Sequence, residues 1–285
     1  MTKNNSSKLN VRSSIFEILK YAILLIFSAF AVYPILRVLT ISLRPSGNLH
    51  STSLAIIPDG ATLQNFINLF TQQLFLRWLG NSLLVTITVT ILGVALASTA
   101  GYAFSRYKFK GKEFGMLSLI ATQMFPVTML LLPLFLILVK LHIYDTFLGL
   151  IIAYSATALP FCIWQMKGFY DTIPVSLEEA AKIDGCNEMT AFTRVTLPLA
   201  APALVITALF TFMSAWSEYL VAAVLISDRS KYTIPLGLKS FQSNFDTEWG
   251  LYAAGSLVVM IPVIILFVVL SRWLVSGLTL GSVKG

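Results

Sequence analysis

The segment LYAAGSLVVMIPVIILFVVLSRWL, Leu251–Leu274, decides the fold class of this chain. Arg272 is the only charged residue in the segment, and it lies close to the C-terminal end. About 20 consecutive apolar residues are enough for a helix to cross the hydrocarbon core of a bilayer. The segment therefore predicts a transmembrane helix.

Five other apolar segments have a similar length: Tyr21–Leu43, Leu79–Phe104, Phe114–Val139, Leu148–Met166 and Ala200–Ile226. Of the 285 residues, 56% are hydrophobic and 12% are charged, whereas a soluble domain carries about 25% charged residues. We therefore predict an all-α membrane protein with six transmembrane helices. Proline in these segments predicts either ordinary kinks or bent helices that line a pathway. The prolines are Pro34, Pro126, Pro133, Pro160, Pro202 and Pro262.

Lysine and arginine in the short loops predict the orientation of these helices. With the N-terminus inside, the inner side holds most of the basic residues, including the run from Arg106 to Lys112. We therefore predict that both termini are cytoplasmic. The predicted layout is a cytoplasmic segment 1–20, a six-helix domain 21–275 and a cytoplasmic tail 276–285. The external segments are then Arg44–Trp78, Lys140–Phe147 and Ser227–Gly250, and the longest cytoplasmic loop is Lys167–Leu199.

The ends of the predicted helices carry two further signals. Trp78 and Trp249 lie at outer boundaries and Trp273 lies at the inner one, which predicts an aromatic belt. The first apolar segment is too long for a cleaved signal peptide, and no small-residue cleavage site follows it.

The cytoplasmic loop Lys167–Leu199 is acidic, unlike the other cytoplasmic loops. Its first predicted helix begins with a capping box in which Ser176 and Glu179 bond each other's backbone. Glu178 and Lys182 are spaced for an ion pair on the helix surface. Gly185 suits the left-handed backbone conformation that often follows the last residue of a helix. Leu177, Ala180 and Ala181 then share one face of this helix.

The second predicted helix of this loop begins at Asn187 as its N-cap and stops at Pro198. Met189, Phe192 and Val195 recur on one of its sides. The predicted product is a helix, a glycine bend and a helix with apolar surface exposed to water. Such a surface predicts a protein partner.

The loop resembles the EAA loop of ABC importer permeases, whose pattern is E-A-A-x3-G-x9-I-x-L-P. The matching residues are Glu179, Ala180, Ala181, Gly185, Leu197 and Pro198, with Val195 in place of the isoleucine. The segments Asn81–Leu83, Gly101–Arg106, Trp249–Gly250 and Arg272–Thr279 are similar to the carbohydrate (maltose-type) permeases of this family. The resemblance covers nearly the whole chain.

The resemblance implies the type I ABC importer fold and a permease subunit for an oligosaccharide, maltodextrin-like or another glycan. It implies three partners in a bacterial cytoplasmic membrane: a second homologous permease, a cytoplasmic ATPase dimer and an extracytoplasmic sugar-binding protein. ATP and Mg would be bound by the ATPase, and the EAA loop would be the coupling helix that contacts it. Glu179 would then pair with a basic group of the ATPase, and Gly185 would permit the bend.

Glu218 is the clearest charged residue within a predicted span. With Trp216 and Tyr219 beside it, and Gln123 in another span, it suggests a substrate pathway, because carboxylates and aromatic rings suit sugars. A structural contact between helices is the alternative. Arg37 is expected to reach outward to the membrane surface or to pair with another subunit, with a ligand role as the alternative.

Two other features have simpler predicted roles. Gly93, Ala97 and Gly101 suggest a close helix contact. The aromatic external segment Ser227–Gly250 is expected, by resemblance, to reach the binding protein, or else to be an ordinary exposed loop.

Several functions lack their motifs. No phosphate-binding loop is present, so we do not expect this chain to hydrolyse ATP. His50 and His142 lie in different external segments, so we predict neither a metal site nor a catalytic constellation. The basic run from Arg106 to Lys112 is interpreted as a topology signal, not a nucleic-acid site. An ion-coupled secondary transporter or channel is the alternative, but Glu218 is a single acid and no inverted repeat is visible.

Overall fold

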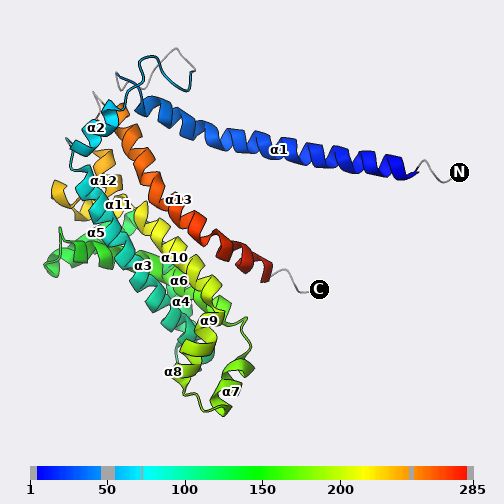
Figure 1. Ribbon diagram of the computed structural model, residues 1–285. Helices are drawn as coiled ribbons and strands as arrows, with labels where there is room; N and C mark the ends of the chain where they lie inside the picture. Colours follow the sequence, from blue (N-terminus) through cyan, green and yellow to red (C-terminus); the bar gives the residue numbers. More distant parts are fainter. Residues whose placement is uncertain (1–4, 46–54, 72, 244–246, 281–285) are drawn as a thin grey trace. The chain divides into compact units, whose positions relative to one another are not determined.

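The computed structural model describes residues 5–45, 55–71, 73–243 and 247–280 (Figure 1). Every regular element within these ranges is a helix, which confirms the all-α prediction. The chain divides into two compact units. The first contains Met1–Gln72 and Phe241–Val258, and the second contains Gln73–Ser240 and Val259–Gly285.

The first unit contains α1 (Asn5–Ser42), α2 (Gln64–Thr71) and the start of α13 (Trp249–Leu280). The Asn65 side chain on α2 donates to the carbonyl oxygens of Ser42 at 2.9 Å and Arg44 at 3.1 Å, so it joins α2 to the end of α1. A side chain at Gly250 would displace the Asn65 carboxamide. Arg37 is half-buried on α1, and it forms no hydrogen bond with the described part of the chain, so its predicted role stays a prediction.

The second unit is a bundle of longer helices with short helical segments at its two ends (Figure 1). The longer helices are α3 (Phe75–Arg106), α4 (Lys112–Gln123), α5 (Val127–Lys140), α6 (Phe147–Tyr170) and α10 (Ala201–Trp216). At one end lie α7 (Val175–Ile183), α8 (Glu188–Ala191), the π-helical turn η1 (Phe192–Thr196) and α9 (Leu197–Leu199). Around the other lie α11 (Leu220–Leu225), the 3-10 turn η2 (Arg229–Lys231) and α12 (Ile234–Lys239).

Small residues let α3 lie close to two neighbouring helices. A side chain at Gly101 would come within 2.8 Å of Met166 Cβ on α6, and one at Gly93 within 2.9 Å of Thr211 on α10. Ala97 between them is fully buried. The predicted contact face of α3 is therefore confirmed, with α6 and α10 as the helices that pack against it.

Two of the predicted spans are not continuous helices. The span Phe114–Val139 is broken at Met124–Pro126, where α4 and α5 are bent by 106°. Pro126 explains this break, because proline lacks an N–H and disfavours helix at the residue before it. The span Ala200–Ile226 is broken at Ser217–Tyr219, between α10 and α11.

Four helices are long and apolar enough to cross a membrane: Phe16–Ser42, Phe75–Arg106, Phe147–Tyr170 and Trp249–Ser271. The described chain has up to six spans if each bent helix pair counts as one. The second bent pair joins Glu188–Leu199 to Ala201–Trp216 at an angle of 76°. The number of crossings is thus between four and six by length and composition.

Helices α3 and α6 run in the same direction. Near their C-terminal ends, Ser105 Oγ donates to Asp171 Oδ1 at 2.7 Å. Near their N-terminal ends both contact the turn around η2. Asn81 Nδ2 donates to the Ser230 carbonyl at 2.9 Å, and Asp145 Oδ1 accepts from the Ser227 backbone at 3.0 Å. The pair α4 and α5 therefore leads from one end of this bundle to the other.

The tryptophan at the start of α3 does not belong to an aromatic belt. Trp78 has 0% of its surface exposed, and its Nε1 donates to the Arg229 carbonyl at 2.8 Å. Its ring leaves no room for a side chain at Gly237 on α12. Trp78 is a core residue because the segment after α11 folds back over it, which its position in the sequence did not reveal.

Candidate functional site

We call residues 171–199 the acidic loop; it contains α7 and α8 at the lower end of the bundle in Figure 1. Gly185 has a left-handed φ of 94°, as predicted. Its N–H donates to Lys182 at 3.1 Å, and the Cys186 N–H donates to Ala181 at 2.9 Å. These paired bonds form a Schellman motif, which ends α7 and turns the chain toward α8.

The second helix of the acidic loop begins as predicted and ends close to the predicted residue. The Asn187 side chain accepts from the Thr190 N–H at 2.8 Å, which confirms the N-cap. The helix passes through η1 and α9 and breaks at Ala200. Pro198 lies in the last turn of this helix, which ends one residue later than predicted and still before the next span.

The predicted capping box and ion pair of α7 are both wrong. Pro174 is the N-cap residue of α7, so Ser176 lies inside the first turn and makes no capping bond. Lys182 pairs with Glu188 at 3.1 Å instead of with Glu178. The reason lies in the tertiary structure, because Glu178 is buried in the bundle against a residue far away in the sequence.

Glu178 is the buried acid of the loop, with 4% of its surface exposed. Its Oε1 accepts from Arg106 Nε at 2.7 Å, and its Oε2 accepts from the Tyr102 hydroxyl at 2.8 Å. Arg106 also donates to the backbone carbonyls of Tyr170 and Ile173, each at 2.9 Å. One guanidinium therefore joins the C-terminal ends of α3 and α6 to α7.

The electrostatics of this site favour the ionised carboxylate. Burial by itself raises the pKa of Glu178, but hydrogen bonds led by that from Arg106 outweigh it and lower the pKa below its usual value. The carboxylate therefore stays charged at neutral pH. Sequence reasoning missed this pair, because Arg106 was interpreted only as a topology signal and no local spacing links it to Glu178.

Two other acids of the loop contact the bundle. Asp171 accepts from Ser105 on α3 at 2.7 Å, and Glu188 accepts from the Tyr107 hydroxyl at 2.7 Å. These contacts hold the acidic loop against α3 and the segment after it. Glu179 is exposed, and it forms no hydrogen bond or ion pair with the part of the chain that the structure describes.

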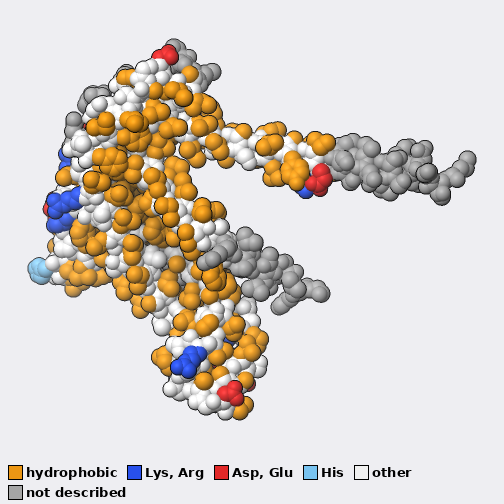
Figure 2. Space-filling model, viewed as in Figure 1, with side chains coloured by type: hydrophobic (Ala, Val, Ile, Leu, Met, Phe, Trp, Pro, Cys, Tyr) orange, Lys and Arg blue, Asp and Glu red, His pale blue; other side chains and the backbone are white. Residues whose placement is uncertain are grey.

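Most residues of the EAA pattern are exposed to solvent, and one of them is packed inside the bundle. Glu179, Ala180 and Gly185 are exposed, Ala181 is half-buried and Pro198 is exposed. Leu197 instead packs against the buried cluster around Tyr170 and Phe192. Large apolar side chains also remain open to solvent, with Ile183 86% and Met189 69% exposed. Figure 2 shows hydrophobic side chains among charged ones at this lower tip.

The apolar residues of the second helix do not form one open face. Met189 is exposed, but Phe192 is buried with its ring centroid 4.4 Å from that of Tyr102. The prediction of one apolar side is therefore wrong for Phe192, which helps fix the loop to α3.

The predicted pathway residues lie at two places in the second unit. Trp216 is 3% exposed, and its Nε1 donates to the Val259 carbonyl at 3.3 Å. Glu218 Oε1 accepts from the Val221 N–H at 2.9 Å, so it caps the start of α11. Tyr219 is half-buried in the same turn. Within the described residues, no hydrogen bond joins this turn to Gln123.

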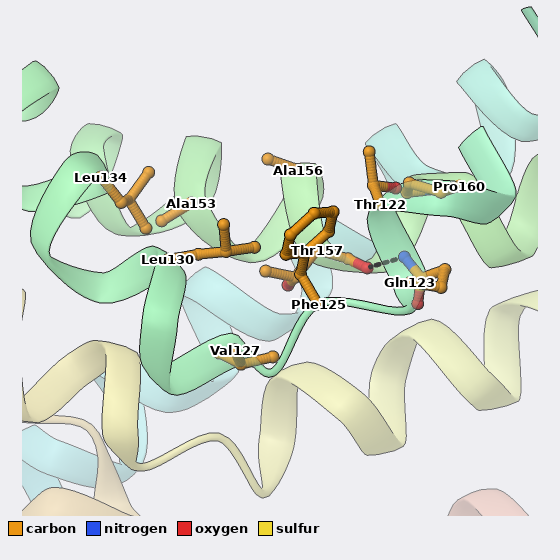
Figure 3. A pocket seen from close by; sticks show the side chains of 10 residues that line it. All are labelled: Thr122, Gln123, Phe125, Val127, Leu130, Leu134, Ala153, Ala156, Thr157 and Pro160. Carbon is orange, nitrogen blue, oxygen red and sulfur yellow. Dashed lines mark hydrogen bonds between the residues drawn. The ribbon is translucent and has the colours of Figure 1, made fainter. Parts of the chain in front are cut away.

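Gln123 lies in a pocket of about 250 Å³ between the α4–α5 break and α6. Its Nε2 donates to the Thr157 carbonyl on α6 at 3.2 Å (Figure 3). The lining residues are Thr122, Gln123, Phe125, Val127, Leu130, Leu134, Ala153, Ala156, Thr157 and Pro160. Figure 3 shows the polar side chains toward one end of the pocket and leucines toward the other.

Among the described residues, no group of three or more His, Cys, Asp or Glu side chains could hold a metal ion. His142 lies after α5 with a left-handed φ of 56°. His50, Asn244, Phe245 and residues 281–285 lie outside the described residues.

Relatives of this chain are similar along almost its whole length. The inner membrane ABC transporter permease protein YcjP of Escherichia coli is 35% identical over 93% of this chain and 95% of its own length. The maltose/maltodextrin transport system permease protein MalG of Vibrio vulnificus is 37% identical over 91% and 93%. The arabinooligosaccharides transport system permease protein AraQ of Halalkalibacterium halodurans is 34% identical over 91% and 94%.

A solved structure shares the fold. It is a chain in the crystal structure of a bacterial ABC transporter involved in the import of the acidic polysaccharide alginate. The TM-score is 0.79 at 24% identity, over 92% of this chain and 98% of that one. Residues 90–279 match the family described as binding-protein-dependent transport system inner membrane component. The chain therefore belongs to this family of inner-membrane transport permeases.

Proposed function

We propose that this permease is one of two homologous membrane subunits of an ATP-driven importer for an oligosaccharide. Relatives with printed substrates are named for maltose or maltodextrin, arabinooligosaccharides, trehalose, diacetylchitobiose and sulfoquinovosyl glycerol, which supports a sugar as cargo. A cytoplasmic ATPase dimer binds ATP and Mg, and an extracytoplasmic protein delivers the sugar. This chain itself needs no cofactor and binds no nucleic acid.

The observation that carries this proposal is the contrast between Glu178 and Glu179. Glu178 fixes α7 to the bundle through Arg106, whereas Glu179 and the apolar side chains of Leu177 and Ile183 remain exposed. A helix fixed to the bundle on one side, with a carboxylate and apolar side chains exposed elsewhere on it, suits a cleft in a partner protein. We assign that cleft to the ATPase.

The proposed arrangement has six crossings with both termini in the cytoplasm. The acidic loop then meets the ATPase, and the external segments 44–78 and 227–250 face the binding protein. In the proposed cycle, ATP binding closes the ATPase dimer, and α7 passes that movement to α3 and α6. The cavity between the two permeases then opens outward and receives the sugar.

The test is reconstitution of the whole importer in proteoliposomes, with uptake and ATP hydrolysis measured together. We expect the binding protein loaded with a neutral oligosaccharide to stimulate ATP hydrolysis and uptake. Glu179→Lys should abolish coupled uptake while the chain still inserts, because a lysine would repel a basic group of the ATPase. Glu113→Lys, at an exposed acid on α4, is the matched control and should retain uptake.

Two results would contradict the proposal. Uptake that requires an ion gradient but no ATPase subunit would indicate a secondary transporter. Normal coupled uptake by Glu179→Lys would show that the exposed carboxylate does not contact the ATPase.

A further inference from the structure

The pocket between the α4–α5 break and α6 is lined by ten residues, none of them charged. We propose that it binds one ring of a neutral saccharide on its way through the permease. This inference rests on the proposed import of sugar and adds a binding site and a ligand class. At about 250 Å³ the pocket lies just below the roughly 300–1,000 Å³ of sites for drug-sized ligands, so it suits a single sugar residue.

The backbone around the pocket is rich in hydrogen-bond acceptors. Pro160 has no N–H, so the carbonyl of Ala156 four residues earlier lacks its usual helical donor. Helix α4 ends at Gln123, and the last four carbonyls of a helix have no intrahelical partner. Those of Thr122 and Gln123 are among them. Both helix irregularities thus place carbonyl acceptors in residues that line the pocket.

The polar side chains of the pocket have largely used their donors. Thr122 Oγ1 donates to the Leu119 carbonyl at 2.7 Å, and Thr157 Oγ1 donates to Tyr154 at 2.9 Å. Each hydroxyl has one proton, so what remains on it is acceptor lone pairs. The Gln123 amide uses one of its two N–H donors on Thr157, which leaves one N–H and the acceptor Oε1.

An acceptor-rich, uncharged pocket selects a ligand that brings O–H donors. A carboxylated sugar would meet carbonyl oxygens and the negative end of the α4 dipole, with no lysine, arginine or histidine in the lining to compensate. The Phe125 ring supplies an apolar face between the polar end and the leucines (Figure 3). A neutral sugar has both an edge of hydroxyls and an apolar C–H face.

The location of the pocket agrees with this assignment. It lies where the chain bends by 106° between α4 and α5. Within a membrane, irregular backbone is tolerated where protein covers it or where it lines a water-filled cavity. Discontinuous helices of this kind form substrate sites in other transporter classes.

The experiment measures whether sugar protects a thiol in the pocket. Ala156→Cys is introduced together with Cys162→Ala and Cys186→Ser, and the importer is assembled with its second permease and ATPase but without binding protein. The probe is whichever of maltose, trehalose and arabinobiose most stimulates ATP hydrolysis when binding protein is present. We expect it to slow alkylation by N-ethylmaleimide at least fivefold, whereas a uronic-acid disaccharide has no effect.

Two variants sharpen this measurement. Gln123→Leu removes an acceptor at nearly constant volume, so about tenfold more sugar should be needed for half-protection. Lys140→Cys, at the exposed end of α5 and outside the pocket, should react at the same rate with or without sugar.

Three results would overturn the pocket assignment. These are no protection by the stimulating neutral sugar, equal protection by the uronic-acid disaccharide, and no alkylation of the Ala156→Cys importer at all. The last would show that another chain or lipid fills the pocket. The proposed function fails separately, if no neutral sugar stimulates ATP hydrolysis with binding protein present.

Discussion

At the scale of single residues, Glu178 and Glu179 are neighbours in the sequence with opposite environments. The Glu178 carboxylate is buried against Arg106 and Tyr102, and the Glu179 carboxylate is exposed. A helix places successive residues about 100° apart around its axis, so one can face the bundle while the next faces outward. One carboxylate of the pair thus attaches α7 to the bundle, and the next one is left exposed.

Glu178→Gln should loosen α7 from the bundle. Glutamine keeps the shape but loses the charge, and hydrogen bonds to charged groups contribute about 1.5–3 kcal/mol. We expect amide hydrogen exchange in α7 to become about thirtyfold faster or more, since about 2 kcal/mol of local opening energy corresponds to that factor. Hydrogen-exchange mass spectrometry of the assembled importer at neutral pH measures this.

Glu179→Gln is the matched control, because the Glu179 side chain has no partner in the described chain. The backbone amides of α7 should then exchange as fast as in the native protein.

Protonation of native Glu178 at acid pH should loosen α7 as the Glu178→Gln substitution does. Its pKa is lowered on folding, so its contribution is complete above the unfolded value near 4.5 and is lost as pH falls through the lower folded value. Equal exchange rates in both variants would contradict a special role for Glu178.

Contacts between residues close in the sequence could be predicted from it, and contacts between residues far apart could not. Gly185 and Asn187 act on backbone groups a few residues away, so their roles could be inferred from spacing alone. Arg106, the partner of Glu178, is the last residue of α3, and only the parallel packing of α3 and α6 brings it near. The capping-box prediction failed for the same reason, because Pro174 and the buried carboxylate set where α7 begins.

At the scale of helices, the crossing of α3 and α6 depends on the absence of a side chain at Gly101. A Cβ there would lie 3.0 Å from the Lys167 backbone nitrogen, an atom that cannot move without shifting α6. Gly101→Ala should therefore destabilise the second unit by about 1–3 kcal/mol, as overpacked cores generally do. The measurement is the temperature at which half of the detergent-purified importer loses its monodisperse peak.

Gly80→Ala offers a control within the same helix. Gly80 is exposed, and no atom lies within 4 Å of the position its Cβ would take. Alanine there should raise stability by about 0.5–1 kcal/mol through helix propensity. If Gly101→Ala were as stable as Gly80→Ala, the close crossing at Gly101 would not exist in the protein.

The existence of the long helices followed from the sequence, because apolar length directly reflects the thickness of a bilayer. The breaks were harder to infer. Pro126 marks the bend after α4, but Pro160 lies within the continuous helix α6, so proline alone does not distinguish a break from a kink. The turn at Ser217–Tyr219 contains no proline at all, and it is stabilised by the contact of Glu218 with the start of α11.

At the scale of the whole molecule, the parallel direction of α3 and α6 constrains how the chain crosses the membrane. Both helices are long enough to span it, and their C-terminal ends meet at Ser105 and Asp171. The connection between them must therefore return to the opposite face. Alone, α4 and α5 rise only about 18 and 21 Å, short of the roughly 30 Å hydrocarbon core. We therefore predict that α4 and α5, bent by 106°, form one crossing together.

A single bent crossing predicts opposite accessibility at the two ends of the α4–α5 pair. In a variant without Cys162 and Cys186, Lys110→Cys should react with a membrane-impermeant maleimide only after spheroplasts are opened. Lys140→Cys should react in intact spheroplasts, because α5 has then reached the outer face. Labelling of both positions from the same side would make α4 and α5 a re-entrant hairpin. The acidic loop would then lie on the face opposite to an ATPase, so this result also tests the direction in which Glu179 is presented.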